Sequence, residues 1–525
     1  MDNNTNNETK GEIINYECKS YNFIKDSITS SVSYIGSLDE KDGKTRTTLT
    51  IQEVFYIEAN PKGEEKDVKV VFKNINFNFC DDIIFFEQNV GDKQGIINIG
   101  NVKKEKEGHV TVEFDNCTFY GFTNEYLNVI TCGNNATLIL KNTKFSSITY
   151  GASLYGDAKC EVKNCLFDAI TGIFFRVADD ASFYFDSCNA RVDEGIFLQN
   201  QGKTCGGLIE NSAFNAPYYP PVSEDIIKAE QENPFGYMQS INYNCIDSNS
   251  KGKLELNNCV IHGFCLGVFT TNEEKVEIKD CEFSHCYYAM WLNNKTKVVI
   301  TNSKEEKCFK SGLFLTDECT ADISDSRFTK NTYEGICLSH IAKLTLSKCK
   351  TSNNNEAGVR ATGDNSLHIN ECSIQGNGMF GLIVGNGTKA TVSKTTFGDN
   401  KIFQSASSET SEVEIDGCTF LSTGKEKEGQ KVLCHILGTD SSKYNVSNSM
   451  FSSSNKEYVG IKANENAEFL FSECKFRNLE KLAKLEQSSK IYIKDSDLRD
   501  INDPIAEKND ESVLDLENCS GSFDK

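Results

Sequence analysis

The sequence lacks the features of membrane-spanning and secreted proteins. It contains no run of about 18 apolar residues, which excludes an ordinary transmembrane helix. Residues 1–10 are rich in Asn, Thr and Glu and have no apolar core, so we expect no signal peptide at this end. We therefore expect a cytoplasmic, intracellular protein that is not inserted in a membrane.

The sequence also lacks the pattern of helical repeats, and it contains little proline. Within the repeating part of the chain, apolar residues do not recur at positions i, i+3, i+4 and i+7, which argues against leucine-rich, ankyrin or HEAT-type repeats. The chain has 6 prolines, and four of them lie between Pro217 and Pro234. This concentration marks an interruption in an otherwise regular sequence.

What the sequence does contain is a recurring phrase built around an Asn-Cys-x-Phe motif, as in residues 116–119. The second position of the motif is always small and is occupied by Cys, Ser or Thr. From residue 259 onward this position recurs at steps of 22 or 23 residues. The positions concerned are Cys259, Cys281, Ser303, Ser326, Cys349, Cys372, Thr395 and Cys418.

A period of this length is typical of a solenoid, in which each repeat packs only on its neighbours. Each repeat has an alternating apolar and polar run before the small residue, such as residues 344–346, and a second short run about ten residues earlier, such as 335–338. Both runs indicate strands. The sequence therefore predicts an all-β fold, a parallel β-helix of about 20 coils.

The same residues resemble those of the right-handed parallel β-helix repeat proteins. The resemblance rests on the Asn-Cys-x-Phe motifs and on Gly-apolar-x-apolar runs at residues 312–315, 335–338, 358–361 and 381–384. This group has the pectate-lyase-like superfold and includes the carbohydrate-binding and sugar-hydrolase repeats of some F-box proteins. The resemblance implies a single-stranded, right-handed helix, but it implies no single activity, because the superfold hosts lyases, hydrolases, adhesins and non-enzymatic scaffolds.

The repeat pattern predicts one long domain. We expect residues 1–47 to form a flexible tail and an irregular N-terminal cap, since the first coil would otherwise offer an open strand edge to other chains. We expect residues 48–525 to form the β-helix, with insertions near residues 89–108, 216–240 and 423–432. The second insertion carries the proline cluster, and long insertions in a regular scaffold are often functional.

Charge and cysteine content narrow the range of partners. The net charge of −21 argues against nucleic acid and anionic membranes as partners. Of the 22 cysteines, ten occupy the small motif position, where a reducing compartment would keep them as buried thiols. The set His262, Cys265, His285, Cys286 and Cys308 lacks the spacing of a zinc site, so we interpret it as packed core and expect no metal and no cofactor.

Enzymes of this superfold need clustered carboxylates, either for glycosidic bond cleavage or for calcium binding. We looked for such a cluster at the third position of each Gly-apolar-x-apolar run, which is expected to face outward. The row contains no carboxylate, and its one charged member is Arg360. It reads Phe174, Phe197, Phe269, Trp291, Phe314, Cys337, Arg360 and Ile383. The row therefore favours a protein without catalytic activity.

The same row predicts a binding surface, because Phe269, Trp291 and Phe314 come from three successive coils. Aromatic side chains and arginine are over-represented at interaction hot spots, and aromatic rings also stack on sugars. The alternative is that loops cover the row and make it part of the core. The candidate binding residues are Phe269, Trp291, Phe314, Arg360, Tyr218 and Tyr219.

Two functions remain open from the sequence. The first is a non-enzymatic scaffold, a rod that binds other proteins of a larger cytoskeletal, ciliary or viral assembly. The second is a β-helix protein that binds glycans or cleaves polysaccharides as a lyase or hydrolase. The regular repeat and the missing carboxylate cluster favour the first.

Overall fold

The computed structural model describes residues 11–23, 25, 27–39, 41, 43–44, 47–59, 66–80, 95–100, 108–123, 127–217, 243–423, 434–454 and 458–521. They form two compact units, unit 1 (Met1–Lys275) and unit 2 (Val276–Lys525). The described residues contain β-strands and no helix. Among these residues there is no helix with the length and apolar character needed to span a bilayer.

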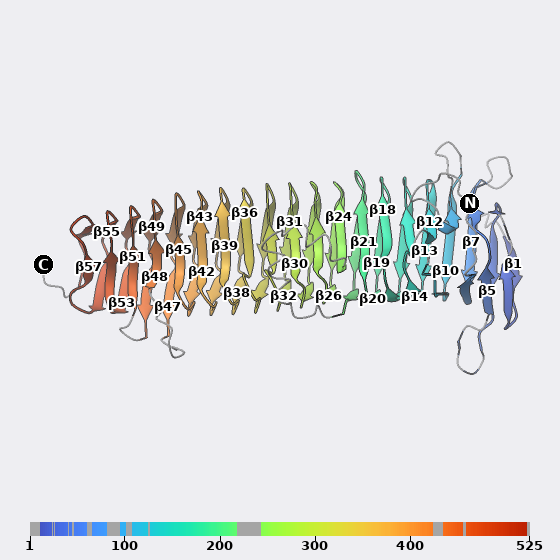
Figure 1. The fold of residues 1–525 in the computed structure, drawn as a ribbon, viewed down its shortest axis with the longest axis horizontal. Helices are drawn as coiled ribbons and strands as arrows, with labels where there is room; N and C mark the ends of the chain where they lie inside the picture. The colour runs from blue at the N-terminus through green and yellow to red at the C-terminus, as the bar shows by residue number, and fades with distance from the viewer. Residues whose placement is uncertain are drawn as a thin grey trace, which may run out of the picture. The chain divides into compact units, whose positions relative to one another are not determined.

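Each unit consists of three parallel sheets, A, B and C, and each coil contributes one strand to each sheet. A strand therefore pairs with the third strand after it in the chain, as β10 does with β13 and β13 with β16. Within each unit, equivalent strands of successive coils follow one another in Figure 1. The coils of the two units amount to about 19 turns, which confirms the predicted all-β parallel β-helix.

In unit 1, sheet A contains β1 (Glu12–Asn15), β4 (Val32–Ile35), β7 (Val68–Lys73), β10 (Val110–Asp115), β13 (Ala136–Lys141), β16 (Lys159–Lys163), β19 (Ser182–Asp186), β22 (Gly206–Glu210) and β25 (Lys253–Asn257). Sheet B contains β2 (Ser20–Phe23), β5 (Thr47–Ile51), β8 (Ile75–Phe79), β11 (Thr118–Tyr120), β14 (Lys144–Ile148), β17 (Leu166–Ile170), β20 (Asn189–Val192), β23 (Ala213–Asn215) and β26 (Val260–His262). Sheet C contains β3 (Ser27–Ile28), β6 (Phe55–Ile57), β9 (Gly95–Ile99), β12 (Asn128–Cys132), β15 (Ala152–Leu154), β18 (Ile173–Ala178), β21 (Gly195–Gln201), β24 (Tyr243–Asn249) and β27 (Leu266–Thr270).

In unit 2, sheet A contains β28 (Lys275–Lys279), β31 (Lys297–Thr301), β34 (Thr320–Ser324), β37 (Lys343–Ser347), β40 (Ser366–Asn370), β43 (Lys389–Ser393), β46 (Glu412–Asp416), β49 (Lys443–Ser447), β52 (Glu468–Ser472), β55 (Lys490–Lys494) and β58 (Val513–Glu517). Sheet B contains β29 (Glu282–Ser284), β32 (Lys304–Glu306), β35 (Arg327–Thr329), β38 (Lys350–Ser352), β41 (Ser373–Gln375), β44 (Thr396–Gly398), β47 (Thr419–Ser422), β50 (Met450–Ser453), β53 (Lys475–Leu479) and β56 (Asp497–Ile501). Sheet C contains β30 (Tyr288–Leu292), β33 (Leu313–Leu315), β36 (Ile336–His340), β39 (Ala357–Gly363), β42 (Phe380–Gly385), β45 (Phe403–Ser407), β48 (Cys434–Gly438), β51 (Val459–Ala463), β54 (Lys481–Leu485) and β57 (Ala506–Lys508).

The Asn-Cys-x-Phe motif forms the corner between sheets A and B. Asn116 has a positive φ of 53°, the left-handed conformation that Asn tolerates and a tight corner requires. The thiol of Cys117 donates a hydrogen bond to the carbonyl of Asp115 at 3.5 Å. The hydroxyl of Thr143 donates to the carbonyl of Lys141 at 2.8 Å in the next coil. A small side chain with one polar hydrogen therefore suits this corner, which explains why Cys, Ser and Thr alternate there.

The Phe of the motif points into the core and stacks on its counterparts. The ring centroids of Phe119 and Phe145 lie 4.6 Å apart in unit 1, and those of Phe420 and Phe451 lie 4.6 Å apart in unit 2. All 22 cysteines carry free thiols, and all except Cys18, Cys80, Cys337 and Cys519 are buried. The motif therefore places one aromatic ring and one small residue per coil into continuous interior columns.

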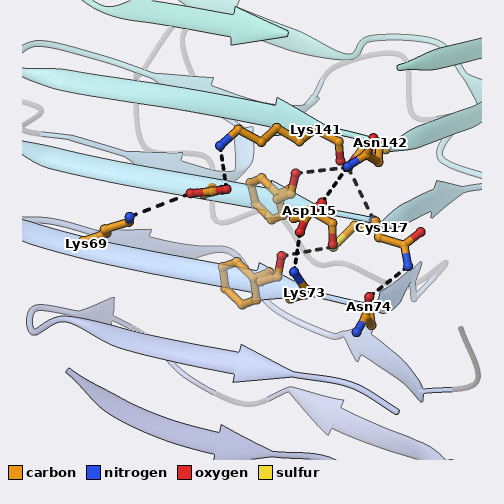
Figure 2. A network of polar contacts seen from close by, with 12 residues as sticks. Lys69, Lys73, Asn74, Asp115, Cys117, Lys141 and Asn142 are labelled. Atoms are coloured by element: carbon orange, nitrogen blue, oxygen red, sulfur yellow. Dashed lines mark hydrogen bonds and ion pairs between the residues drawn. The ribbon is translucent and has the colours of Figure 1, made fainter. Parts of the chain in front are cut away.

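The outer face of sheet A in unit 1 is solvated and carries ion pairs between neighbouring coils. Figure 2 shows Lys73 paired with Asp115 at 2.7 Å, and Asn142 donating to the same carboxylate at 2.9 Å. Lys69 and Lys141 both pair with Glu113, at 3.9 and 2.9 Å. Each charge on this part of the surface therefore already has a partner within the chain.

At two of the predicted domain boundaries, the structure has strands where the sequence predicts a cap or an insertion. Parallel pairing begins with β1 and β4, ahead of residue 48, where the sequence places the start of the helix. Strand β9 lies inside the first predicted insertion, near residues 89–108. Residues 218–242 and 424–433, which make up most of the other two predicted insertions, lie outside the described residues.

Candidate functional site

Sheet C differs from sheet A in how its outward side chains are buried. In unit 2, all five residues of β45 are buried, whereas β43 of sheet A alternates exposed and buried side chains. In unit 1, β12 is buried throughout, whereas the outward residues of β13 are half-exposed. In these strands, therefore, the outward side chains of sheet C are more deeply buried than those of sheet A in the same unit.

In unit 2, strand register confirms most of the predicted outward row. Trp291 pairs with Phe314, Phe314 with Cys337, Cys337 with Arg360, and Arg360 with Ile383. Trp291 is only 5% exposed, whereas Phe314 and Arg360 are half-buried. The row is thus partly covered at Trp291 and open to solvent at Phe314.

A second outward column adds Tyr288 to this aromatic group. The ring centroids of Tyr288 and Phe314 lie 5.6 Å apart and nearly parallel, and those of Trp291 and Phe314 lie 5.4 Å apart at 50°. Tyr288 lies 5.4 Å from Trp291, so the three rings contact one another. Offset and tilted ring pairs of this kind are the favoured aromatic geometries.

The guanidinium of Arg360 lies between two carboxylates that come from the turns before β36 and β39. Its Nε pairs with Oε1 of Glu334 at 2.7 Å, and its Nη2 pairs with Oε2 of Glu356 at 2.7 Å. The hydroxyl of Ser311 donates to the other oxygen of Glu334, also at 2.7 Å. Burial raises the pKa of Glu356, and the neighbouring Glu334 raises it further. Arg360 offsets that repulsion by bonding both groups.

Beyond Arg360, both outward columns of unit 2 become apolar. The rings of Phe380 and Phe403 stack with centroids 5.8 Å apart. Phe403, Ala406, Cys434 and Val459 are buried on this face, with the half-buried Phe380, Ile383, Ile402 and Leu437 packed against them. We call the outward surface formed by the aromatic rings, the Arg360 ion pairs and this apolar cluster the unit 2 face.

The outward row of unit 1 is polar, and part of it was predicted wrongly. Phe174 and Phe197 are 1% and 0% exposed and pack in the core. Gly172 and Gly195, which begin their runs, lie two positions earlier in the strand register than the motif glycines of later coils. The third residue of each of these two runs is therefore not in the outward row. The true row is read from the register of the sheet C strands. It consists of Thr131, Ser153, Arg176, Gln199, Asp247 and Phe269. We call it the unit 1 row.

The row therefore does contain a carboxylate, contrary to the prediction. Desolvation raises the pKa of Asp247 to about 6. Among the described residues, Asp247 has no hydrogen-bond or ion-pair partner, and the guanidinium of Arg176 bonds only to Oε1 of Gln199, at 3.2 Å. The proline-rich stretch before β24 hid this position, since no glycine run marks the strand.

Other residues of the two faces were missed for a similar reason. Glu334 lies one place before Gly335 and Glu356 lies two places before Gly358, outside the single column that the motif defines. Aligning the two positions before each glycine in every coil would have found both. The predicted binding residues Tyr218 and Tyr219 lie outside the described residues, whereas Phe269 is half-buried at the end of the unit 1 row.

Within the part of the chain that the structure describes, no group of three or more His, Cys, Asp or Glu side chains is arranged to hold a metal ion. Of the Cys and His set that the sequence singled out, Cys265, Cys286 and Cys308 are buried. Burial raises the pKa of the Cys308 thiol well above its usual value, which disfavours the thiolate that metals bind.

Fold and sequence together define the class of protein. The family model described as right handed beta helix region matches residues 237–368 and 290–449. The matched residues are similar to right-handed β-helix repeats, and the described residues of each unit form a parallel β-helix. No curated protein matches the sequence.

Solved structures with the same fold have little sequence in common with this chain. The A-module of mannuronan C-5 epimerase AlgE4 from Azotobacter vinelandii is 12% identical, with 79% of this chain and 91% of that chain covered and a TM-score of 0.36. The N-terminal fragment of gene product 12 of bacteriophage Phi29 is 10% identical, with 93% and 88% covered and a TM-score of 0.42. The PL6 family alginate lyase AlyGC is 9% identical, with 98% and 97% covered and a TM-score of 0.29. These likenesses concern the fold alone.

Proposed function

We propose that this is a non-enzymatic binding protein that docks a partner protein on the unit 2 face, as a component of a larger assembly. The observation that supports this most is the composition of the face. Aromatic rings, a partly buried arginine and an apolar cluster lie together on one outward surface. Surfaces that bind proteins are enriched in aromatic residues and Arg at their energetic centres.

The outer face of sheet A in the same unit provides the contrast. Its exposed residues include Thr345, His368 and Thr391, which follow one another in neighbouring coils. Polar, flexible side chains of this kind are ordinary solvent-exposed strand residues and do not form a contiguous apolar surface. Leu470 on the outer face of sheet A is 46% exposed, but the unit 2 face is where aromatic rings, a partly buried arginine and apolar side chains lie together.

The ion pairs of the unit 2 face argue against catalysis there. Glycosidic cleavage needs one carboxyl group that gives up a proton and a second one that attacks or activates water. Here Glu334 and Glu356 both bond Arg360, and Glu334 is also fixed by Ser311. The carboxylates therefore serve to hold the guanidinium in place. The apolar cluster beside them suits a protein surface better than a polyhydroxylated glycan.

The test is affinity capture with the full-length protein from an extract of its source cells, followed by quantitative mass spectrometry. Variants Phe314→Ala and Arg360→Lys remove the open aromatic ring and the two-carboxylate bridge, which lysine does not reproduce. Thr345→Ala, on the outer face of sheet A, is the matched control. We expect wild type and Thr345→Ala to recover the same few proteins in stoichiometric amounts, and both face variants to lose them.

Two results would contradict the proposal. One is recovery of the same proteins by all four forms, which would place the contact elsewhere. The other is binding to defined glycans on an array, lost in Phe314→Ala, with no protein recovered, which would support the carbohydrate-binding alternative. Circular dichroism of each variant must match the wild type for either result to count.

A further inference from the structure

The unit 1 row combines opposite charges that are not paired with each other. Arg176 and Asp247 face outward from β18 and β24 with Gln199 of β21 between them. Neighbouring strands lie about 4.8 Å apart, so the two charges are separated by about 10 Å along the row. This distance is too long for a direct ion pair.

The charges on the outer face of sheet A in this unit are arranged differently. On the outer face of sheet A, Lys69, Lys73 and Lys141 all bond carboxylates of neighbouring coils. Asp247 is also poorly solvated, since burial is the cause of its raised pKa. A desolvated carboxyl group without a partner costs free energy, which a cation would offset.

Two buried hydroxyl groups of the same row, before Arg176, also lack a partner among the described residues. The Oγ of Ser153, which is 0% exposed, has no hydrogen-bond partner, and neither has Oγ1 of Thr131, which is 7% exposed. Both residues belong to the same outward row, and Ser153 pairs with Arg176. Buried polar atoms in native proteins are nearly always hydrogen-bonded, so these two hydroxyl groups show that the polar groups of the row are incompletely satisfied within the described part of the chain.

We propose that the unit 1 row binds an extended peptide, whose carboxylate pairs with Arg176 and whose cationic side chain pairs with Asp247. Side chains on the same face of an extended chain are two or four residues apart, which is about 7 or 13 Å, and these two spacings bracket the distance between the charges. Phe269 follows Asp247 in the row and offers a ring on which the stem or head of a Lys or Arg side chain packs. A neutral glycan would leave both charges without a counter-charge.

This site lies in unit 1, and it does not depend on the partner proposed for the unit 2 face. The test measures binding of short synthetic peptides to the full-length protein by fluorescence anisotropy. The probes carry one Glu and one Lys about two or four residues apart, so that both face the row in an extended peptide, or two Glu, two Lys or two Gln at the same positions. A neutral oligosaccharide serves as a fifth probe.

We expect the wild type to prefer the Glu and Lys peptide at least about tenfold over the Gln peptide. Asp247→Lys should shift the preference to the two-Glu peptide, and Arg176→Glu should shift it to the two-Lys peptide. Lys69→Gln, which removes a cation from the outer face of sheet A, should change nothing. Because neither row residue is ion-paired, the variants should keep the circular dichroism spectrum of the wild type.

Equal binding of the Gln peptide, or no peptide binding at any concentration tested, would overturn the proposal. Binding of the oligosaccharide in place of the peptides, lost in Asp247→Asn, would overturn it in favour of a glycan site. Capture of a partner through the unit 2 face would be unaffected by these variants, so failure of one proposal is distinguishable from failure of the other.

Discussion

The outward rows of sheet C in the two units have the same backbone arrangement, but they differ in whether their charged side chains form ion pairs. In unit 2, Arg360 bonds two carboxylates of its own chain. In unit 1, Arg176 bonds only the amide of Gln199 among the described residues, and Asp247 bonds nothing. The difference shows that the fold supplies evenly spaced outward positions, whereas the chemistry at each position depends on whether a neighbouring coil supplies the counter-charge.

The first prediction concerns the interior, where the two units resemble each other because each buries a carboxyl group. Burial raises the pKa of Glu274 in unit 1 and of Glu305 in unit 2 from 4.5 to about 8. Glu305 stands in the column between Phe283 and Phe328, where Oε2 accepts a hydrogen bond from Asn331 at 2.8 Å.

Both groups should make the protein less stable at high pH. A raised pKa means that the folded state keeps a proton that the unfolded state releases, so this stability is present below pH 4.5 and lost as the pH rises to 8. Glu305→Gln and Glu274→Gln should each gain on the order of a few kcal/mol relative to wild type between pH 5 and pH 8. Urea unfolding at both pH values measures this, and an unchanged pH slope would refute it.

The second prediction breaks the paired row. Glu334→Gln leaves Arg360 half-buried with one carboxylate, and the side chain of Glu334 is only 10% exposed. We expect a loss of about 2 to 3 kcal/mol in the free energy of unfolding. Glu356→Gln, at a side chain that is 30% exposed, should cost less and serves as the control. Equal losses in both variants would show that burial does not set the strength of the pair.

The third prediction concerns His435, whose two ring nitrogens have no hydrogen-bond partner in the core of unit 2. Burial lowers its pKa from 6.5 to about 3. The unfolded state therefore takes up a proton that the folded state does not, and stability falls as the pH drops from 6.5 toward 3. At pH 5 this loss should reach about 2 kcal/mol. His435→Leu should remove it, as measured by urea unfolding at pH 5 and 7; an unchanged acid slope would contradict this.

The fourth prediction sharpens the comparison from the other side. Because Arg176 has no ion-pair partner among the described residues, Arg176→Gln should change the free energy of unfolding by less than about 0.5 kcal/mol. Asp247→Asn should instead stabilise the protein at pH 7, because it removes a desolvated carboxylate. The largest effect of these changes should appear in peptide binding instead. Differential scanning calorimetry of both variants measures the stability. A large destabilisation would mean that the row is held by contacts within the chain.

The fold was predictable from the sequence because each coil repeats the same local physics. The left-handed Asn, the small hydrogen-bonding residue and the stacked Phe recur at one spacing, and all three occupy the positions that the pattern indicates. Glu305 was visible as the coil in which Glu replaces this Phe. Its protonation could not be predicted, because that depends on complete burial and on Asn331 from the next coil.

The site was predictable only where strands keep the common register. The row from Trp291 to Ile383 was found because a motif glycine or an aligned strand marks each coil. Arg176 and Asp247 were missed because the glycines of unit 1 stand two places earlier and no glycine precedes β24 at the expected place. Glu334 and Arg360 stand at different positions of their coils. An alignment of one position per coil therefore could not predict that they form an ion pair.

The central claim, that the unit 2 face docks a protein, is tested most directly by site-specific photo-crosslinking. A photoreactive phenylalanine analogue placed at Phe314, and at Thr345 as the control, is activated in an extract of the source cells. The account predicts that position 314 crosslinks to the same one or few proteins in every preparation, and that position 345 does not. Equal crosslinking at both positions, or none at position 314, would contradict it.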